Sequence, residues 1–140
     1  MKKVLVIDDE AILRNMLVRM LESGNFEARS AENGTEGMAI CRDWVPDIVL
    51  TDVFMPEKDG LETIRAVRKL RKNIRIIAMS GGGEMGEFAM LRIARMMGAM
   101  RTLTKPFTMA ELKITLDEVL TETTAETRDE EPDPPDDGSG

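Results

Sequence analysis

Apolar and polar positions in this chain alternate in five successive blocks, each with a short strand-like run followed by a segment of helical spacing. The strand-like runs are 2–7, 26–30, 48–51, 74–79 and 100–104. The segments whose apolar residues recur every three or four positions are 11–23, 35–43, 61–72, 87–97 and a last one that follows Thr108. Because strand and helix alternate with short connections, the pattern predicts an α/β fold with a parallel sheet and helices on both faces.

Several helix ends are marked in the sequence. Gly24 and Gly98 stand where the first and fourth helices should end, because glycine adopts the backbone conformations that close a helix. Thr108 and Glu111 form the pattern T-x-x-E, a capping box that predicts the start of the last helix. The segment 80–86, "SGGGEMG", has the composition of a loop.

Polar residues follow the predicted strands at one end. They are Asp8, Asp9, Asp52, Ser80 and Lys105. The carboxyl ends of parallel strands meet at one edge of a sheet, where α/β folds bind their ligands. We therefore expect these five residues, which are far apart in sequence, to converge on one site.

Three carboxylates at one edge repel one another unless a positive charge joins them. A divalent cation supplies that charge, and oxygen ligands in an open site favour Mg²⁺, which pairs readily with phosphate. Lys105 adds an ammonium group and Ser80 a hydroxyl donor. Together these groups indicate phosphoryl transfer, in which an aspartate can itself be the nucleophile.

The composition narrows the possible chemistry. Histidine is absent and Cys41 is the only cysteine, so the chain has no histidine-based acid–base chemistry, no zinc-site spacing and no internal disulfide. No apolar stretch is long enough for a signal-peptide core or a membrane span. We therefore expect a cytoplasmic protein that does not associate with membranes.

The net charge of −7 comes from one end of the chain. Thr121 to Gly140 hold eight acidic residues and one arginine, whereas residues 1–120 carry 18 charges of each sign. This neutral body gives no reason to expect nucleic-acid binding. The acidic end has three prolines and almost nothing apolar. We expect one domain over 1–121 and a disordered, acidic, proline-rich tail over 122–140.

One face of the third predicted helix is basic. It carries Arg65, Arg68, Lys69 and Lys72. A solvated surface is the commonest role for such a stripe, and the acidic tail is then a solubilising extension. The alternative is that the tail folds back onto the stripe, an attraction that salt would screen.

Four stretches, in this order and spacing, resemble the receiver domain of two-component response regulators over residues 2–121. They are "VLVIDDE", "PDIVLTDVFMPEKDGLE", "MSGG" and "LTKPF". The resemblance implies a (βα)5 flavodoxin-like fold with strand order 2-1-3-4-5. It also implies that Asp52 accepts a phosphoryl group, that Asp9 and Asp52 ligate Mg²⁺ directly, that Asp8 acts largely through water, and that the Phe54 backbone carbonyl completes the ligands.

The same resemblance implies roles for the other residues. Lys105, Ser80 and the Gly81 N–H would bind phosphoryl oxygens, and the Lys105–Pro106 peptide bond would be cis. The phosphodonor would be a phosphohistidine on a sensor histidine kinase or a histidine phosphotransfer protein. Output would be a downstream protein bound at the helix 4–strand 5–helix 5 face, or the passing on of the phosphoryl group.

Thr102 departs from the family pattern, because an aromatic residue usually stands three positions before the lysine. We expect the signal to travel instead through residues 81–97, whose amide exchange should change on activation. Thr102 also leaves open a degenerate receiver that acts as an unphosphorylated scaffold. A third reading, a phosphohydrolase of the haloacid-dehalogenase kind, is disfavoured because such enzymes have an acid two positions after the nucleophile, where this chain has Phe54.

Overall fold

The computed structural model describes residues 1–53, 60–81 and 87–122, without the side chains of Glu87 and Phe88. The predicted role of the Phe54 carbonyl therefore lies outside the described residues. So does the predicted tail beyond Glu122.

Strands and helices alternate along the described residues as the sequence pattern predicts. In chain order they are β1 (Lys3–Ile7), α1 (Ala11–Ser23), β2 (Glu27–Ala31), α2 (Gly34–Asp43), β3 (Ile48–Asp52), α3 (Gly60–Leu70), β4 (Arg75–Gly81), α4 (Glu87–Met97), β5 (Arg101–Lys105) and α5 (Met109–Thr121). All neighbouring strands pair in parallel, in the order β2-β1-β3-β4-β5. The flavodoxin-like α/β fold and its strand order are confirmed.

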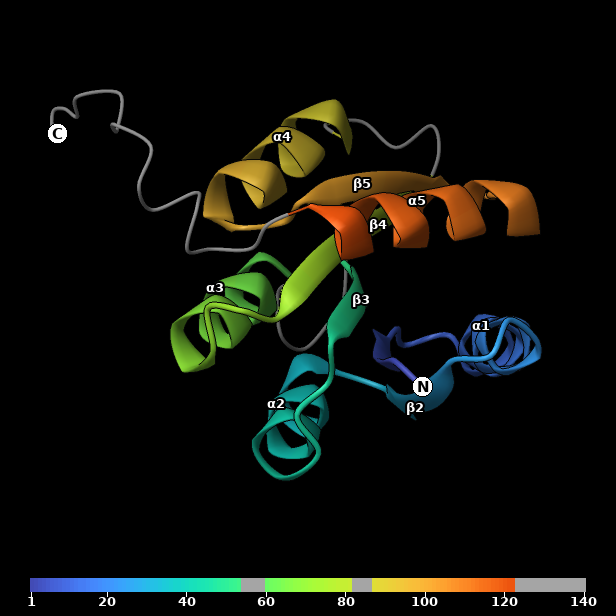
Figure 1. Ribbon diagram of the computed structural model, residues 1–140. Helices are drawn as coiled ribbons and strands as arrows, with labels where there is room; N and C mark the ends of the chain where they lie inside the picture. The colour runs from blue at the N-terminus through green and yellow to red at the C-terminus, as the bar shows by residue number, and fades with distance from the viewer. Residues whose placement is uncertain (54–59, 82–86, 123–140) are drawn as a thin grey trace, which may run out of the picture.

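Alternating strand residues divide the core into two layers. In β1, Val4 and Val6 pack with α1 and α5, whereas Leu5 and Ile7 pack with the layer of α2, α3 and α4. Figure 1 shows this arrangement, with α1 and α5 to one side of the sheet and the other three helices to the opposite side. Because both faces are covered, the central strands β1 and β3 are almost entirely buried and carry the apolar runs 4–7 and 48–50, as buried parallel strands do.

The fourth strand is longer than the sequence predicts. Ser80 and Gly81 belong to β4 and pair with Thr104 and Lys105 of β5. Our expectation that these two residues open a loop is wrong, because pairing with a distant strand outweighs the turn preference of a glycine-rich segment.

The turn after α1 also differs in detail. Asn25 has a positive φ of 70°, whereas Gly24 stays at −93°. Asparagine tolerates this left-handed conformation better than most residues, so it takes the role expected of the glycine. At the end of α4, Gly98 has a φ of 134° and fulfils the prediction made for it.

The two ends of α5 are held by side chains. At its start, the Thr108 hydroxyl accepts a hydrogen bond from the Glu111 N–H at 3.0 Å, and the Glu111 carboxylate accepts one from the Thr108 N–H at 2.8 Å. This confirms the capping box. At its end, the guanidinium group of Arg75 donates to the carbonyls of Val119 at 2.6 Å and Glu122 at 3.3 Å. These arginine bonds satisfy carbonyls that have no partner within the helix.

None of the helices in the described part of the chain is long and apolar enough to cross a membrane.

Candidate functional site

The carboxyl ends of the central strands bring the predicted site residues together. Asp8 directly follows β1, Asp52 is the last residue of β3, and Lys105 is the last residue of β5. Asp8 is fully buried and Asp52 is 5% exposed, whereas Asp9 is exposed. The convergence expected from the parallel topology is therefore present for these residues.

Lys105 connects the two buried carboxylates. Its Nζ lies 3.1 Å from Asp8 Oδ2 and 3.1 Å from Asp52 Oδ2. The Lys105 side chain is only 15% exposed, so both ion pairs are shielded from bulk water. Charge-assisted hydrogen bonds in such surroundings are stronger than surface ion pairs.

The pKa of Lys105 reports this environment. Burial disfavours the ammonium form, but attraction to Asp52 and Asp8 and hydrogen bonds to both carboxylates outweigh burial, so the pKa of Lys105 lies above its ordinary value. Lys105 therefore remains a cation throughout the neutral pH range.

Backbone contacts fix the position of Asp8. The Glu10 N–H donates to Asp8 Oδ1 at 2.9 Å, and the Arg14 guanidinium group donates to the Asp8 carbonyl at 2.7 Å. The Asp8 N–H donates to the carbonyl of Ala31 at 3.1 Å, which continues the pairing of β1 with β2. Both oxygens of the Asp8 carboxylate thus have a donor, one from the backbone and one from Lys105.

Asp8, Asp9 and Asp52 form a cluster of acids with the donor set of a hard cation. One carboxylate oxygen from each lies within 4.8 Å of the other two. Within the described part of the chain, Lys105 brings one positive charge to these three carboxylates, which leaves negative charge that a divalent ion would balance. Mg²⁺ prefers oxygen ligands and usually keeps several bound waters. The three carboxylates supply such oxygens, and the exposed Asp9 leaves the cluster partly open to solvent. The residues fit the magnesium site that the sequence predicts.

Ser80 and Gly81 lie on the strand between Asp52 and Lys105. Asp52 pairs with Met79, so Ser80 is the next residue along β4, and Gly81 pairs with Lys105. Ser80 is fully buried. Both residues therefore lie at the predicted edge of the sheet, as parts of the strand.

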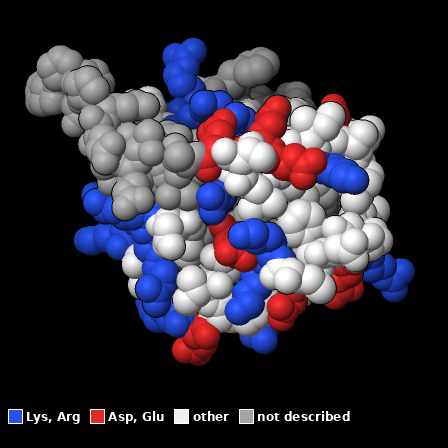
Figure 2. Space-filling model, viewed as in Figure 1, with Lys and Arg blue, Asp and Glu red and all other residues white. Residues whose placement is uncertain are grey.

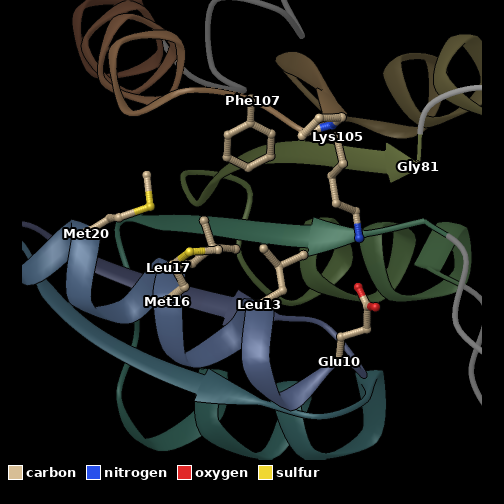
Figure 3. A pocket seen from close by; sticks show the side chains of 9 residues that line it. Glu10, Leu13, Met16, Leu17, Met20, Gly81, Lys105 and Phe107 are labelled. Atoms are coloured by element: carbon tan, nitrogen blue, oxygen red, sulfur yellow. The ribbon is translucent and has the colours of Figure 1, made fainter.

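A groove that the sequence analysis missed opens beside Lys105. It has a volume of about 460 Å³ and is lined by Glu10, Leu13, Met16, Leu17, Met20, Gly81, Lys105, Pro106 and Phe107. Figure 3 shows Phe107 facing the apolar side chains of α1 across the groove, with Lys105 and Glu10 at its polar end. The helical spacing of Leu13 and Met20 predicts burial, but both are only half-buried because they line this groove. The peptide bond between Lys105 and Pro106, on its rim, is cis as expected.

The fold and the acidic cluster with its lysine define a class of protein. The family model for the response regulator receiver domain matches residues 4–117. The chain belongs to this family, whose members are phosphoacceptor signalling domains of two-component systems.

Individual relatives agree with this assignment. The chain is 37% identical over 107 residues to the chemotaxis protein CheY of Thermotoga maritima, a match that covers 76% of this chain and 87% of the relative. It is 30% identical over 112 residues to the sporulation initiation phosphotransferase F of Bacillus subtilis, with 80% of this chain and 88% of the relative covered. The solved structure of the Vibrio cholerae chemotaxis protein CheY4 matches with a TM-score of 0.77 and 30% identity, over 85% of this chain and 98% of that one.

Proposed function

We propose that this receiver domain accepts a phosphoryl group on Asp52 from a phosphohistidine of a partner protein. The observation that carries the proposal is the Lys105 ammonium group, 3.1 Å from the carboxylates of both Asp52 and Asp8 at the carboxyl edge of the sheet. The chain contains no histidine, so the donor imidazole belongs to a sensor histidine kinase or a histidine phosphotransfer protein.

The transfer is a nucleophilic displacement at phosphorus. A carboxylate oxygen of Asp52 forms a bond to phosphorus while the bond between phosphorus and the donor imidazole nitrogen breaks, and the electron pair returns to the imidazole. Asp52 becomes an acyl phosphate. Lys105, already hydrogen-bonded to the attacking carboxylate, binds a phosphoryl oxygen and stabilises its charge.

Mg²⁺ is the proposed cofactor. Asp9 and Asp52 would hold it directly, Asp8 largely through water, and the Phe54 backbone carbonyl would complete the protein ligands. Bound there, the ion would neutralise charge on the phosphoryl oxygens and on the carboxylates. Support comes from the three carboxylate oxygens within 4.8 Å of one another and from the excess of negative charge beside Lys105.

Ser80 and Gly81 are the proposed link between phosphorylation and output. Both would donate hydrogen bonds to phosphoryl oxygens, and the Ser80 side chain would move toward the phosphate. A downstream protein would read the change at the α4–β5–α5 face, in a cytoplasmic setting that suits a chain with one cysteine. Passing the phosphoryl group on is the other proposed output, and similarity to a sporulation phosphotransferase favours it.

Incubation with a small acyl phosphate and Mg²⁺, followed by intact-mass measurement, tests the proposal. We expect one phosphoryl group per chain, lost in Asp52→Asn and retained in Asp43→Asn, which removes an exposed acid on α2. An unlabelled wild-type protein that still binds its partners would establish the alternative, a degenerate receiver that serves as a scaffold.

A further inference from the structure

Charge is divided unevenly within the neutral body of the chain. Residues 1–62 carry 13 acids and seven bases, whereas residues 63–120 carry five acids and 11 bases. The stretch 123–140 holds seven acids and one arginine. The basic half of the domain is thus joined directly to a strongly acidic segment.

Many bases of this half lie on α3, on the two residues that follow it, and on α4. We call the following exposed residues the basic face: Arg65, Lys69, Arg71, Lys72, Arg92 and Arg95. The two helices pack against each other in the same layer. Figure 2 shows lysine and arginine side chains gathered at the left of the view, over the region where Figure 1 places α3.

Arg68 joins the two helices at this face. A methyl group on Gly98, just after α4, would lie 2.7 Å from the Arg68 Cδ, so the stem of this arginine already fills the space beside the end of α4. One of its guanidinium nitrogens donates to the Lys72 carbonyl at 3.3 Å. Arg68 therefore links the basic residues at the end of α3 to the residue that follows α4.

The acidic segment begins at the same end of the molecule. Helices that connect parallel strands end where the next strand begins, so the last turns of α3 and α4 lie near Arg75 and Arg101, the first residues of β4 and β5. The last turn of α5 is bound to these two arginines. Arg75 donates to the Glu122 carbonyl, and Arg101 forms ion pairs with the carboxylates of Glu118 and Glu122.

The length of the segment suits this surface. An extended chain advances at most about 3.3–3.6 Å per residue, so the 18 residues after Glu122 reach up to about 60 Å, more than the width of a domain of this size. Tethering at Glu122 also keeps the segment at a local concentration in the millimolar range. Reach and tethering together favour contact within one molecule.

We propose that residues 123–140 bind the basic face of the same molecule. Glu122, paired with Arg101, is the first contact, and the acids that follow pair with the lysines and arginines of the basic face. The occupant is an acidic peptide because none of the described side chains on the exposed sides of α3 and α4 is an aromatic ring on which a nucleic-acid base would stack. The bound segment screens this face from other acidic partners.

A spin label on the segment tests the proposal in the full-length chain. Cys41 is buried, and burial raises the pKa of its thiol to about 11, so a Ser139→Cys variant reacts selectively at residue 139. At about 0.01 M salt, where the Debye length is about 30 Å, we expect paramagnetic broadening of amide signals in α3 and α4 and little in α1. At about 1 M salt, where the Debye length is about 3 Å, the broadening should disappear.

Charge variants identify the contact. In the labelled chain, Lys69→Gln, Arg71→Gln and Arg95→Gln together should reduce the broadening to its high-salt level. The matched set Lys2→Gln, Arg19→Gln and Lys113→Gln removes the same charge from exposed positions outside the basic face and should leave the broadening unchanged. Equal effects of the two sets would overturn the proposal.

Two further results would also overturn it. One is broadening spread evenly over α1 and α5. The other comes from a mixture of two kinds of chain: spin-labelled chains without isotope enrichment, and isotope-enriched chains without a spin label. Broadening that is as strong in this mixture would mean that the contact is between molecules. The measurement uses neither Mg²⁺ nor a phosphodonor, so its failure is distinct from a failure of Asp52 to accept phosphate.

Discussion

The backbone of Gly60 lies directly against the backbone of Asp52. A side chain on Gly60 would overlap the Asp52 carbonyl oxygen and the Val53 backbone, none of which can move aside as a flexible side chain can. The Gly60 N–H also donates to the Val53 carbonyl at 3.2 Å. The start of α3 thus braces the end of the strand that carries the proposed phosphoacceptor.

Replacing Gly60 by alanine should therefore disturb both stability and the site. We expect a loss of about 1–3 kcal/mol in the free energy of unfolding, typical of overpacking, together with slower labelling of Asp52 by an acyl phosphate. Urea titration and intact-mass kinetics measure the two effects. Gly24→Ala is the control, because a methyl group there meets its nearest atom at an ordinary 3.5 Å. Equal stability of the two variants would contradict the bracing role.

Lys105 should make the stability depend on alkaline pH. Its pKa is raised in the folded state because the pull of Asp52 and Asp8 exceeds the effect of burial, so the ion pairs contribute fully below the unfolded pKa of about 10.4. Their contribution is lost as the pH rises through the higher folded pKa. Urea titrations of wild type and Lys105→Met should differ by about 1–3 kcal/mol at neutral pH and converge in strong alkali.

Lys113→Met is the control for this experiment, because Lys113 is an exposed lysine on α5. Its difference from wild type at neutral pH should be small, because an exposed charge contributes little to stability. Cys41 titrates in all three proteins and cancels in the comparison. Wild-type and Lys105→Met curves that stay parallel up to alkaline pH would show that the ion pairs contribute nothing.

Magnesium should stabilise the folded protein. A ligand that binds only the folded state at a hundredfold excess over its dissociation constant adds about 2.7 kcal/mol to the free energy of unfolding. Thermal unfolding should report this gain in wild type, and Asp9→Asn should abolish it. Glu10→Gln, which changes the neighbouring exposed acid, should keep it. A gain of similar size in Asp9→Asn would place the ion elsewhere.

Cys41 should be unreactive in the native protein. Burial raises the pKa of its thiol from 9.0 to about 11, against a smaller lowering effect of Arg42. At pH near 8 the fraction of Cys41 present as thiolate is then about a hundredfold lower in the folded protein than in the unfolded chain, since each pKa unit is a factor of ten. Alkylation by iodoacetamide should be at least that much slower in buffer than in urea. Comparable rates under the two conditions would show that α2 opens readily.

Most of the fold follows from local patterns in the sequence. The apolar run of β1 ends at Asp8, the helical spacing in α3 marks its buried side, and Thr108 with Glu111 sets the start of α5. Parallel topology then brings Asp8, Asp52 and Lys105 to one edge, because each follows or ends a strand. These features depend on residues that are close together in the sequence and on the spacing of apolar residues, both of which can be read from a single sequence.

Features that depend on distant contacts were not predictable in this way. The extension of β4 through Ser80 and Gly81 requires the pairing with β5, which lies more than 20 residues further along the chain. The groove beside α1 exists because Phe107 stands away from Leu13 and Met20, although their spacing equals that of core residues. No local signal in the sequence specifies either arrangement.

The side chains of β4 alternate between the two core layers, and this alternation limits which insertions and deletions the protein can tolerate. Ile76 and Ala78 belong to one core layer, and Ile77 and Met79 to the other. Losing one residue within the strand would exchange the two sets between layers and also change the position of Ser80 relative to Asp52. Losing two residues would preserve the alternation while shortening the strand. Families of related sequences should therefore show length variation in the connections around β4 and almost none inside it.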